Sequence, residues 1–147
     1  MNGNGINAYR QANVETADPK RLVIMSYDAV ISSLISARDH YRADEFEEKA
    51  RSLQRAIDIL CALISALDFD KGGEVARNLE ALYNFMVRRL TEADLNRDMK
   101  GFDETIRMLE ELRSAWQEIF FGAPRAAALA VNIAPAREEG MAAAVTG

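Results

Sequence analysis

Histidine, cysteine and paired acidic residues are the side chains most often used for metal binding and covalent catalysis, and this chain has few suitable sets of them. It contains one histidine, His40, and one cysteine, Cys61. A di-iron site in a helical bundle requires Glu-x-x-His units on facing helices, and Ala37 stands three residues before His40. Cys61 lies between Leu60 and Ala62 with no histidine near it in the sequence, which favours a packed thiol over a nucleophile. The sequence therefore predicts no metal centre and no cysteine catalysis.

Other short motifs also lack the partners that catalysis or phosphate binding would need. The KGG segment at residues 71–73 lacks the spaced glycines and the Lys-Ser/Thr ending of a phosphate-binding loop. Tyr27-Asp28 has no second group for acid–base work. Arg88-Arg89 is too short for a nucleic-acid patch, and the net charge of −5 disfavours binding to a phosphate backbone. We expect a protein that is not an enzyme, needs no cofactor and binds no nucleic acid.

Four stretches of the chain have apolar residues at intervals of three and four, which is typical of amphipathic helices. The predicted helices span residues 19–41, 44–69, 74–96 and 102–120. The links between them are short, and short links make successive helices antiparallel neighbours. The sequence therefore predicts an all-α fold, an antiparallel up-down four-helix bundle over residues 18–121.

Polar residues and glycines mark the ends of these helices. Asp18 before Pro19 is a strong helix start, because the carboxylate can accept from free amides and proline loses no hydrogen bond there. Asp44 and Glu47 have the spacing of a capping box for the second helix. The glycines at residues 72–73 can adopt positive φ, so we expect them to close the second helix and reverse the chain.

The two ends of the chain differ in composition from the bundle. Residues 1–17 are polar with a few apolar side chains, which predicts a mobile N-terminal arm that docks on a groove or, alternatively, a frayed terminus. Residues 122–147 are alanine-rich and interrupted by Pro124 and Pro135, which predicts a flexible tail; its segment 126–134 could form a short helix against the bundle. No secretory signal and no membrane-spanning run is present, so we expect a cytoplasmic protein without membrane insertion.

The first three predicted helices carry more apolar side chains than one contact face requires. In the second helix, one row alternates in spacing between four and three residues, the pattern of a heptad seam, and another row runs beside it. The first row is Phe46, Ala50, Leu53, Ile57, Leu60, Ile64 and Leu67, and the second is Ala56, Ile59, Leu63 and Ala66. The surplus apolar surface either is buried on a second side of the bundle or binds a partner.

Residues 67–98, LDFDKGGEVARNLEALYNFMVRRLTEADLNRD, resemble the signature of the flagellin export chaperone family (FliS). The segment ADPKRLVIMSYDAVI at 17–31 resembles the opening helix of the family, with Asp18, Ser26 and Ala29 in place of its Ser, Leu and Gly. GINAYRQ at 5–11 is similar to the family's arm, and LEELRSAWQEI at 109–119 to its closing helix. The resemblance covers roughly residues 5–120 and supports the helical-bundle prediction.

The resemblance implies a cytoplasmic chaperone that binds the disordered C-terminal segment of flagellin, prevents its premature polymerisation and delivers it to the flagellar type III export gate. In the arm, Ile6 and Tyr9 are expected to cover part of the client groove when no client is bound and to dock on the export gate. The helix residues that we expect to line the client groove are Ile31, Leu63, Tyr83 and Val87.

Two alternatives remain open from the sequence. The surplus apolar rows are also compatible with a self-associating bundle, so that the protein is a monomer or a weak homodimer without client, or a scaffold. Members of the family can also bind other flagellar regulators, and such a role in flagellar assembly is the second alternative.

Overall fold

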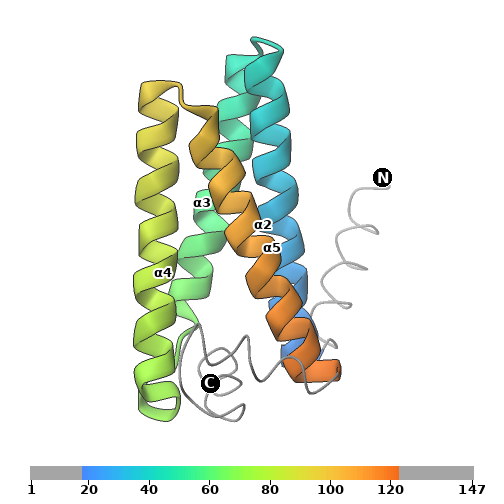
Figure 1. The fold of residues 1–147 in the computed structure, drawn as a ribbon, viewed down its shortest axis with the longest axis vertical. Coiled ribbons are helices and arrows are strands. Elements are labelled where there is room, and N and C mark those ends of the chain that lie inside the picture. The colour runs from blue at the N-terminus through green and yellow to red at the C-terminus, as the bar shows by residue number, and fades with distance from the viewer. Residues whose placement is uncertain (1–17, 123–147) are drawn as a thin grey trace, which may run out of the picture.

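The computed structural model of the chain describes residues 18–122, and these residues form four α-helices. They are α2 (Pro19–Arg42), α3 (Phe46–Ser65), α4 (Phe69–Asn96) and α5 (Met99–Phe121). The links comprise residues 43–45, 66–68 and 97–98 and connect helices that run in opposite directions (Figure 1). The predicted arm at residues 1–17 and the predicted tail beyond Gly122 lie outside the described residues.

Each helix packs against two others, in the order α2, α3, α4, α5 and back to α2. The α2–α3 pair has the most extensive contact. Helices α4 and α5 meet at their short link and diverge toward the opposite end of the bundle (Figure 1). This arrangement confirms the predicted all-α, antiparallel up-down four-helix bundle.

Aspartate side chains begin three of the four helices. The Oδ1 atom of Asp18 accepts from the amide of Lys20 at 2.9 Å, with Pro19 in the first turn, as predicted. Asp68 and Asp98 cap α4 and α5 in a similar way. Each carboxylate accepts a hydrogen bond from an amide that has no carbonyl partner within the helix. Its negative charge also interacts favourably with the positive end of the helix dipole.

The predicted capping box at the start of the second helix is wrong. Asp44 has a left-handed backbone with φ of 59°, and α3 begins two residues later without a side-chain cap. The residue instead ends α2, because the turn at Asp44 allows the amide of Glu45 to donate to the carbonyl oxygen of His40 at 2.8 Å. Aspartate is one of the few residue types that tolerate this backbone conformation.

The predicted position of the turn between the second and third helices is also wrong. The chain reverses at residues 66–68, and Phe69 already begins α4 because Asp68 accepts from the amide of Lys71. Gly73 has the predicted positive φ, at 52°, but it produces a kink after the first turn of α4. A Cβ atom placed on Gly73 would have no neighbour within 4 Å, so the backbone conformation rather than lack of space favours glycine there.

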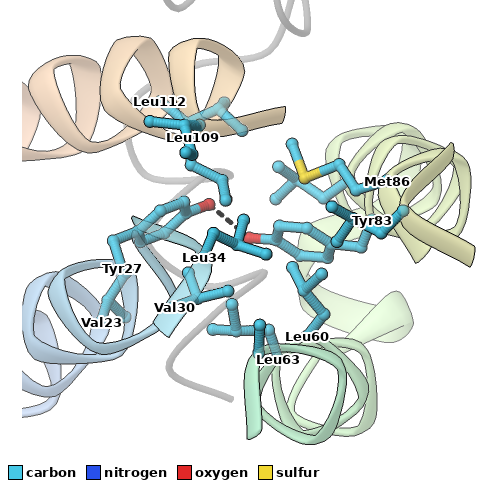
Figure 2. Close-up of a cluster of buried hydrophobic side chains, with 14 of the residues drawn as sticks. Val23, Tyr27, Val30, Leu34, Leu60, Leu63, Tyr83, Met86, Leu109 and Leu112 are labelled. Atoms are coloured by element: carbon cyan, nitrogen blue, oxygen red, sulfur yellow. Dashed lines mark hydrogen bonds between the residues drawn. The ribbon is translucent and has the colours of Figure 1, made fainter. Parts of the chain in front are cut away.

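Apolar side chains from all four helices fill the centre of the bundle (Figure 2). The large side chains that are fully buried are Tyr27, Val30, Leu34, Leu60, Leu79, Tyr83, Met86, Leu90, Phe102, Leu109 and Trp116. In the predicted heptad row of α3, Leu53, Leu60 and Leu67 are buried, but Phe46 and Ala50 are exposed. The remaining buried positions of α3 come mainly from the second row, so the core-facing stripe runs between the two rows that the sequence suggested.

Candidate functional site

Three polar groups from three helices meet inside this apolar core. The hydroxyl groups of Tyr27 on α2 and Tyr83 on α4 are 2.5 Å apart. The dashed line in Figure 2 marks this hydrogen bond. The indole Nε1 of Trp116 on α5 donates to the Tyr27 hydroxyl at 3.0 Å. All three side chains are fully buried. The trio therefore links three of the four helices through groups that satisfy one another, as buried polar groups must.

The environment of the trio keeps both phenols protonated. Burial raises the pKa of Tyr27 from 10.0 to about 12, although the hydrogen bonds from Tyr83 and Trp116 lower it. Burial also raises the pKa of Tyr83 well above its usual value, and the nearby Tyr27 raises it further. Neither hydroxyl group has the lowered pKa or the open access that a general base or nucleophile needs. The trio thus has the character of a structural core network.

The position of Tyr83 corrects one of the four predicted groove residues. Its ring lies among core side chains and its hydroxyl group is bonded to Tyr27, so none of the side chain faces the outer surface. The sequence placed it on a widened apolar face of the helix, and the structure places it at the centre of that face. Tyr83 is a core residue in this structure.

Ile31 is partly buried where α2 meets α5. Asp28 and Arg38 share its side of the helix, at three and seven residues' distance. Asp28 pairs with Arg113 of α5, and the Nη1 atom of Arg38 lies 3.0 Å from Oδ1 of Asp103 of α5. Ile31 therefore lies along the α2–α5 boundary, between two ion pairs that join these helices.

Val87 and Leu63 lie along two other boundaries. Val87 is partly buried and lies two turns before Asp94, whose Oδ1 is 2.5 Å from Nζ of Lys49 on α3, so Val87 faces the α3–α4 boundary. Leu63 is a buried member of the core cluster, 8% exposed, and it lies three turns after Ser52, whose hydroxyl group bonds that of Ser36 on α2 at 3.1 Å. Leu63 thus faces the α2–α3 boundary.

The predicted groove residues are therefore not gathered into one groove. Ile31, Val87 and Leu63 face three different boundaries between helices, which we call the apolar edges, and Tyr83 lies in the core. Ile6 and Tyr9 lie outside the described residues. Whether the residues of the apolar edges contact a client stays a prediction.

Several exposed apolar side chains were not among the groove residues predicted from the sequence. Phe85 on α4 is 44% exposed although it directly precedes the fully buried Met86. Adjacent helix positions are about 100° apart around the axis, so the regular spacing of the buried α4 residues was the signal that Phe85 points outward. Leu95, near the end of α4, is 81% exposed.

Cys61 departs from its prediction. Its side chain is exposed on α3, so the interpretation as a packed thiol is wrong. Within residues 18–122, no three His, Cys, Asp or Glu side chains are grouped so that they could hold a metal ion. None of the four described helices is both long enough and apolar enough to span a membrane.

Comparisons with known proteins agree with this architecture. The family model described as flagellar protein FliS matches residues 2–122. The chain is 38% identical over 120 residues to the flagellar secretion chaperone FliS of Salmonella typhimurium, covering 78% of this chain and 89% of that protein. It is 36% identical over 109 residues to the flagellar secretion chaperone FliSB of Pseudomonas aeruginosa, covering 74% and 86%.

A relative with lower sequence identity matches a similar share of the chain. The flagellar secretion chaperone FliS of Bacillus subtilis is 29% identical over 115 residues, covering 78% of this chain and 85% of that protein. The matched region contains all four helices, including the trio and the apolar edges. The chain therefore belongs to the FliS family of flagellar secretion chaperones.

Proposed function

We propose that this protein binds the C-terminal segment of flagellin, keeps it from polymerising before export and delivers it to the flagellar type III export gate. The observation that carries the proposal is the match to the FliS family over residues 2–122, with relatives named flagellar secretion chaperones. The protein acts by binding and release, without catalysis.

The apolar edges are suited to an extended client. A disordered segment that folds on binding can place its apolar side chains at several separated sites, because its backbone bends between them. Ile31, Leu63 and Val87 face different boundaries of the bundle, so a client that contacts all three must pass around the outside of the molecule. Such a path buries a large apolar area, which offsets the entropy lost when the client becomes ordered.

Ion pairs beside the edges limit what can bind there. At the α2–α5 boundary, Arg38–Asp103 and Asp28–Arg113 satisfy the nearby charges within the bundle itself. A client at this boundary then gains mainly from apolar contacts, since these charges already have partners. We expect client affinity to depend only weakly on salt concentration for the same reason.

The N-terminal residues have a separate role in this proposal. Ile6 and Tyr9 cover part of the client surface when no client is present and dock on the export gate during delivery. Removal of residues 1–17 is expected to change client affinity and to reduce export, and both can be measured on the same truncated variant. Unchanged affinity together with unchanged export would exclude this role.

Calorimetric titration with a peptide from the C-terminal segment of the same organism's flagellin tests client binding. We expect saturable one-to-one binding with a strongly negative heat-capacity change, because apolar area is buried. Ile31→Ser and Val87→Ser should each weaken binding roughly fivefold, which corresponds to about 1 kcal/mol for a side chain that is already partly buried.

Leu95→Ser is the matched control, since it removes an exposed apolar side chain away from the apolar edges. Its affinity should equal that of the unmodified protein. An absence of binding by a folded bundle, checked by circular dichroism, would contradict the proposed function. Equal weakening by all three substitutions would contradict the assignment of the apolar edges.

A further inference from the structure

Two cations and three aromatic rings gather where α2 begins and α5 ends. The Nζ atom of Lys20 lies 5.9 Å from the ring centre of Phe120, and Cζ of Arg21 lies 5.4 Å from that of Phe121. Phe120 stacks on Trp116 at 5.1 Å, and Phe121 is 45% exposed. We call this cluster the α2–α5 corner; Figure 1 shows the two helix ends close together at the lower end of the bundle.

The cations of this corner differ from those that join helices elsewhere. Arg38, Lys49, Arg89 and Arg113 all pair with carboxylates of a neighbouring helix. Within residues 18–122, neither Lys20 nor Arg21 forms an ion pair. Both lie over aromatic faces instead, so the corner offers positive charge beside exposed apolar surface.

Glu118 provides the opposite charge on the last turn of α5. Its Oε2 atom is buried from solvent, and no hydrogen-bond partner for it is found among the described residues. A buried carboxylate oxygen without a donor is unfavourable, so a cation or amide from another segment would stabilise it.

The chain itself contains a segment with the complementary chemistry. Residues 123–147 follow directly from the corner and lie beyond the region that matches the family. The segment begins with Ala123, Pro124 and Arg125, continues with the apolar run AAALAVNIA at 126–134 and then carries Arg137 followed by Glu138 and Glu139. In the order in which the chain leaves α5, it therefore presents a cation, an apolar stretch, and then a pair of anions directly preceded by one further cation.

We propose that residues 123–147 dock on the α2–α5 corner, with run 126–134 against Phe120 and Phe121 and with Glu138 and Glu139 facing Lys20 and Arg21. In this docked arrangement Arg125, three residues beyond Gly122, would pair with Glu118. The 16 residues 123–138 can span up to roughly 50 Å when extended, so the segment is long enough to turn back on the corner.

This contact is independent of the proposed function and adds an intramolecular partner surface to the bundle. The α2–α5 corner lies next to Asp18, the position at which residues 1–17 join the bundle. The docked segment occupies surface beside the start of the N-terminal residues and thereby limits the directions in which they can leave α2.

Backbone relaxation of the ¹⁵N-labelled full-length protein tests the contact. The backbone amides of residues 126–139, apart from Pro135, should have order parameters near those of a rigid backbone, about 0.85, rather than below about 0.6. In Lys20→Glu/Arg21→Glu these values should fall below about 0.6. Addition of Glu138→Lys and Glu139→Lys to that variant should restore them, because the charges are then exchanged.

Arg88→Glu/Arg107→Glu is the matched control, with the same change in charge at two exposed arginines on α4 and α5. It should leave residues 126–139 unaffected. Order parameters below about 0.6 in the unmodified protein would overturn the proposal, as would values insensitive to the reversal at Lys20 and Arg21. A response confined to residues 1–17, or one that depends on protein concentration, would show that another segment or a second copy occupies the corner.

Discussion

The hydroxyl groups of Tyr27 and Tyr83 depend on each other and on Trp116. Tyr27 is the central member of the trio, because its hydroxyl oxygen accepts from the indole and also bonds Tyr83. Loss of the Tyr27 hydroxyl leaves two buried polar groups without partners, whereas after loss of the Tyr83 hydroxyl the Tyr27 hydroxyl keeps its hydrogen bond from the indole. The free energy of unfolding should therefore respond unequally to the two substitutions.

We predict that Tyr83→Phe lowers the free energy of unfolding by about 0.5–1.5 kcal/mol, the usual net contribution of one hydrogen bond. Tyr27→Phe should lower it by more. Urea-induced unfolding followed by circular dichroism measures both. Client affinity of folded Tyr83→Phe should stay unchanged, because the hydroxyl group does not reach the surface. Equal stability losses would contradict the central role of Tyr27.

The raised pKa values predict a stability loss at high pH. Below pH 10 both tyrosines are protonated in the folded and unfolded states. Between pH 10 and about 12, the unfolded state loses the phenolic proton while folded Tyr27 retains it, so the unfolded state binds fewer protons and is favoured. Stability should fall by up to about 1.4 kcal/mol per pH unit for each tyrosine.

The double variant Tyr27→Phe/Tyr83→Phe provides the control for this pH dependence. It lacks both phenols, so any decline in its stability above pH 10 comes from other groups. Urea unfolding of both proteins at a series of pH values gives the difference. An identical decline in the two proteins would show that the buried phenols do not cause it.

At the level of helices, the approach of α4 to α5 depends on two small residues. A Cβ atom on Gly101 would lie 2.4 Å from Cβ of Ala93 and 3.0 Å from Nη1 of Arg89. The missing side chain thus allows the helices to meet directly after their link. It also leaves room for Arg89, which pairs with Glu104 at 3.0 Å and with Asp98 at 3.3 Å.

We predict that Gly101→Ala is destabilising, although alanine is the better helix former. Overpacking typically costs about 1–3 kcal/mol, and it exceeds the gain in helix propensity of about 1 kcal/mol only if the helices must move apart. Ala93 has no rotatable side chain that could move aside, so we expect a net loss of about 1 kcal/mol. Thermal unfolding measures it.

Ala93→Gly in the Gly101→Ala background tests the cause of the loss. It removes the methyl group that clashes with the new Cβ atom at position 101. The free energy of unfolding that Gly101→Ala lowers should therefore be partly restored, despite the poor helix propensity of glycine. A further loss equal to that of Ala93→Gly alone would mean that the two positions do not interact.

The sequence was sufficient for the number and order of the helices, because hydrophobic periodicity and the Asp18-Pro19 start are local signals. It failed at Asp44 and at Gly72-Gly73, where two local signals compete. Asp44 can cap the next helix or end the previous one, and which of the two occurs depends on the backbone conformation of the whole turn. The cap from Asp68 similarly moved the chain reversal ahead of the glycines.

The candidate site was less predictable than the fold, because a wide apolar stripe does not show where its centre lies. Tyr83 and Val87 are four residues apart and belong to the same stripe, yet one is fully buried and the other lies at an edge. Burial of this kind depends on which helices pack on each side, and that information is distributed over the whole chain.

On the scale of the whole molecule, the partly exposed apolar residues are distributed around the bundle. A stable dimer usually buries about 1,200–2,000 Å² in one continuous interface. Here the partly buried Ile31 and Val87 face separate boundaries, each with an ion pair beside it. This distribution disfavours pairing of two copies through a single face and suits a client that passes around the bundle.

We predict that the protein without client sediments as a monomer of 16.4 kDa over a wide concentration range. Analytical ultracentrifugation measures this directly. Mass that rises with concentration would support the self-associating alternative, and Phe46→Ser on the exposed face of α3 would then show whether the heptad row is responsible.

The buried trio also gives the molecule an internal optical reporter. Trp116 is the single tryptophan of the chain, and it is fully buried, stacked on Phe120 and hydrogen-bonded to Tyr27. Its emission arises from one environment, where α2, α4 and α5 meet. A red shift of that emission would report the separation of these helices, so the opening of the bundle can be followed in the unlabelled protein.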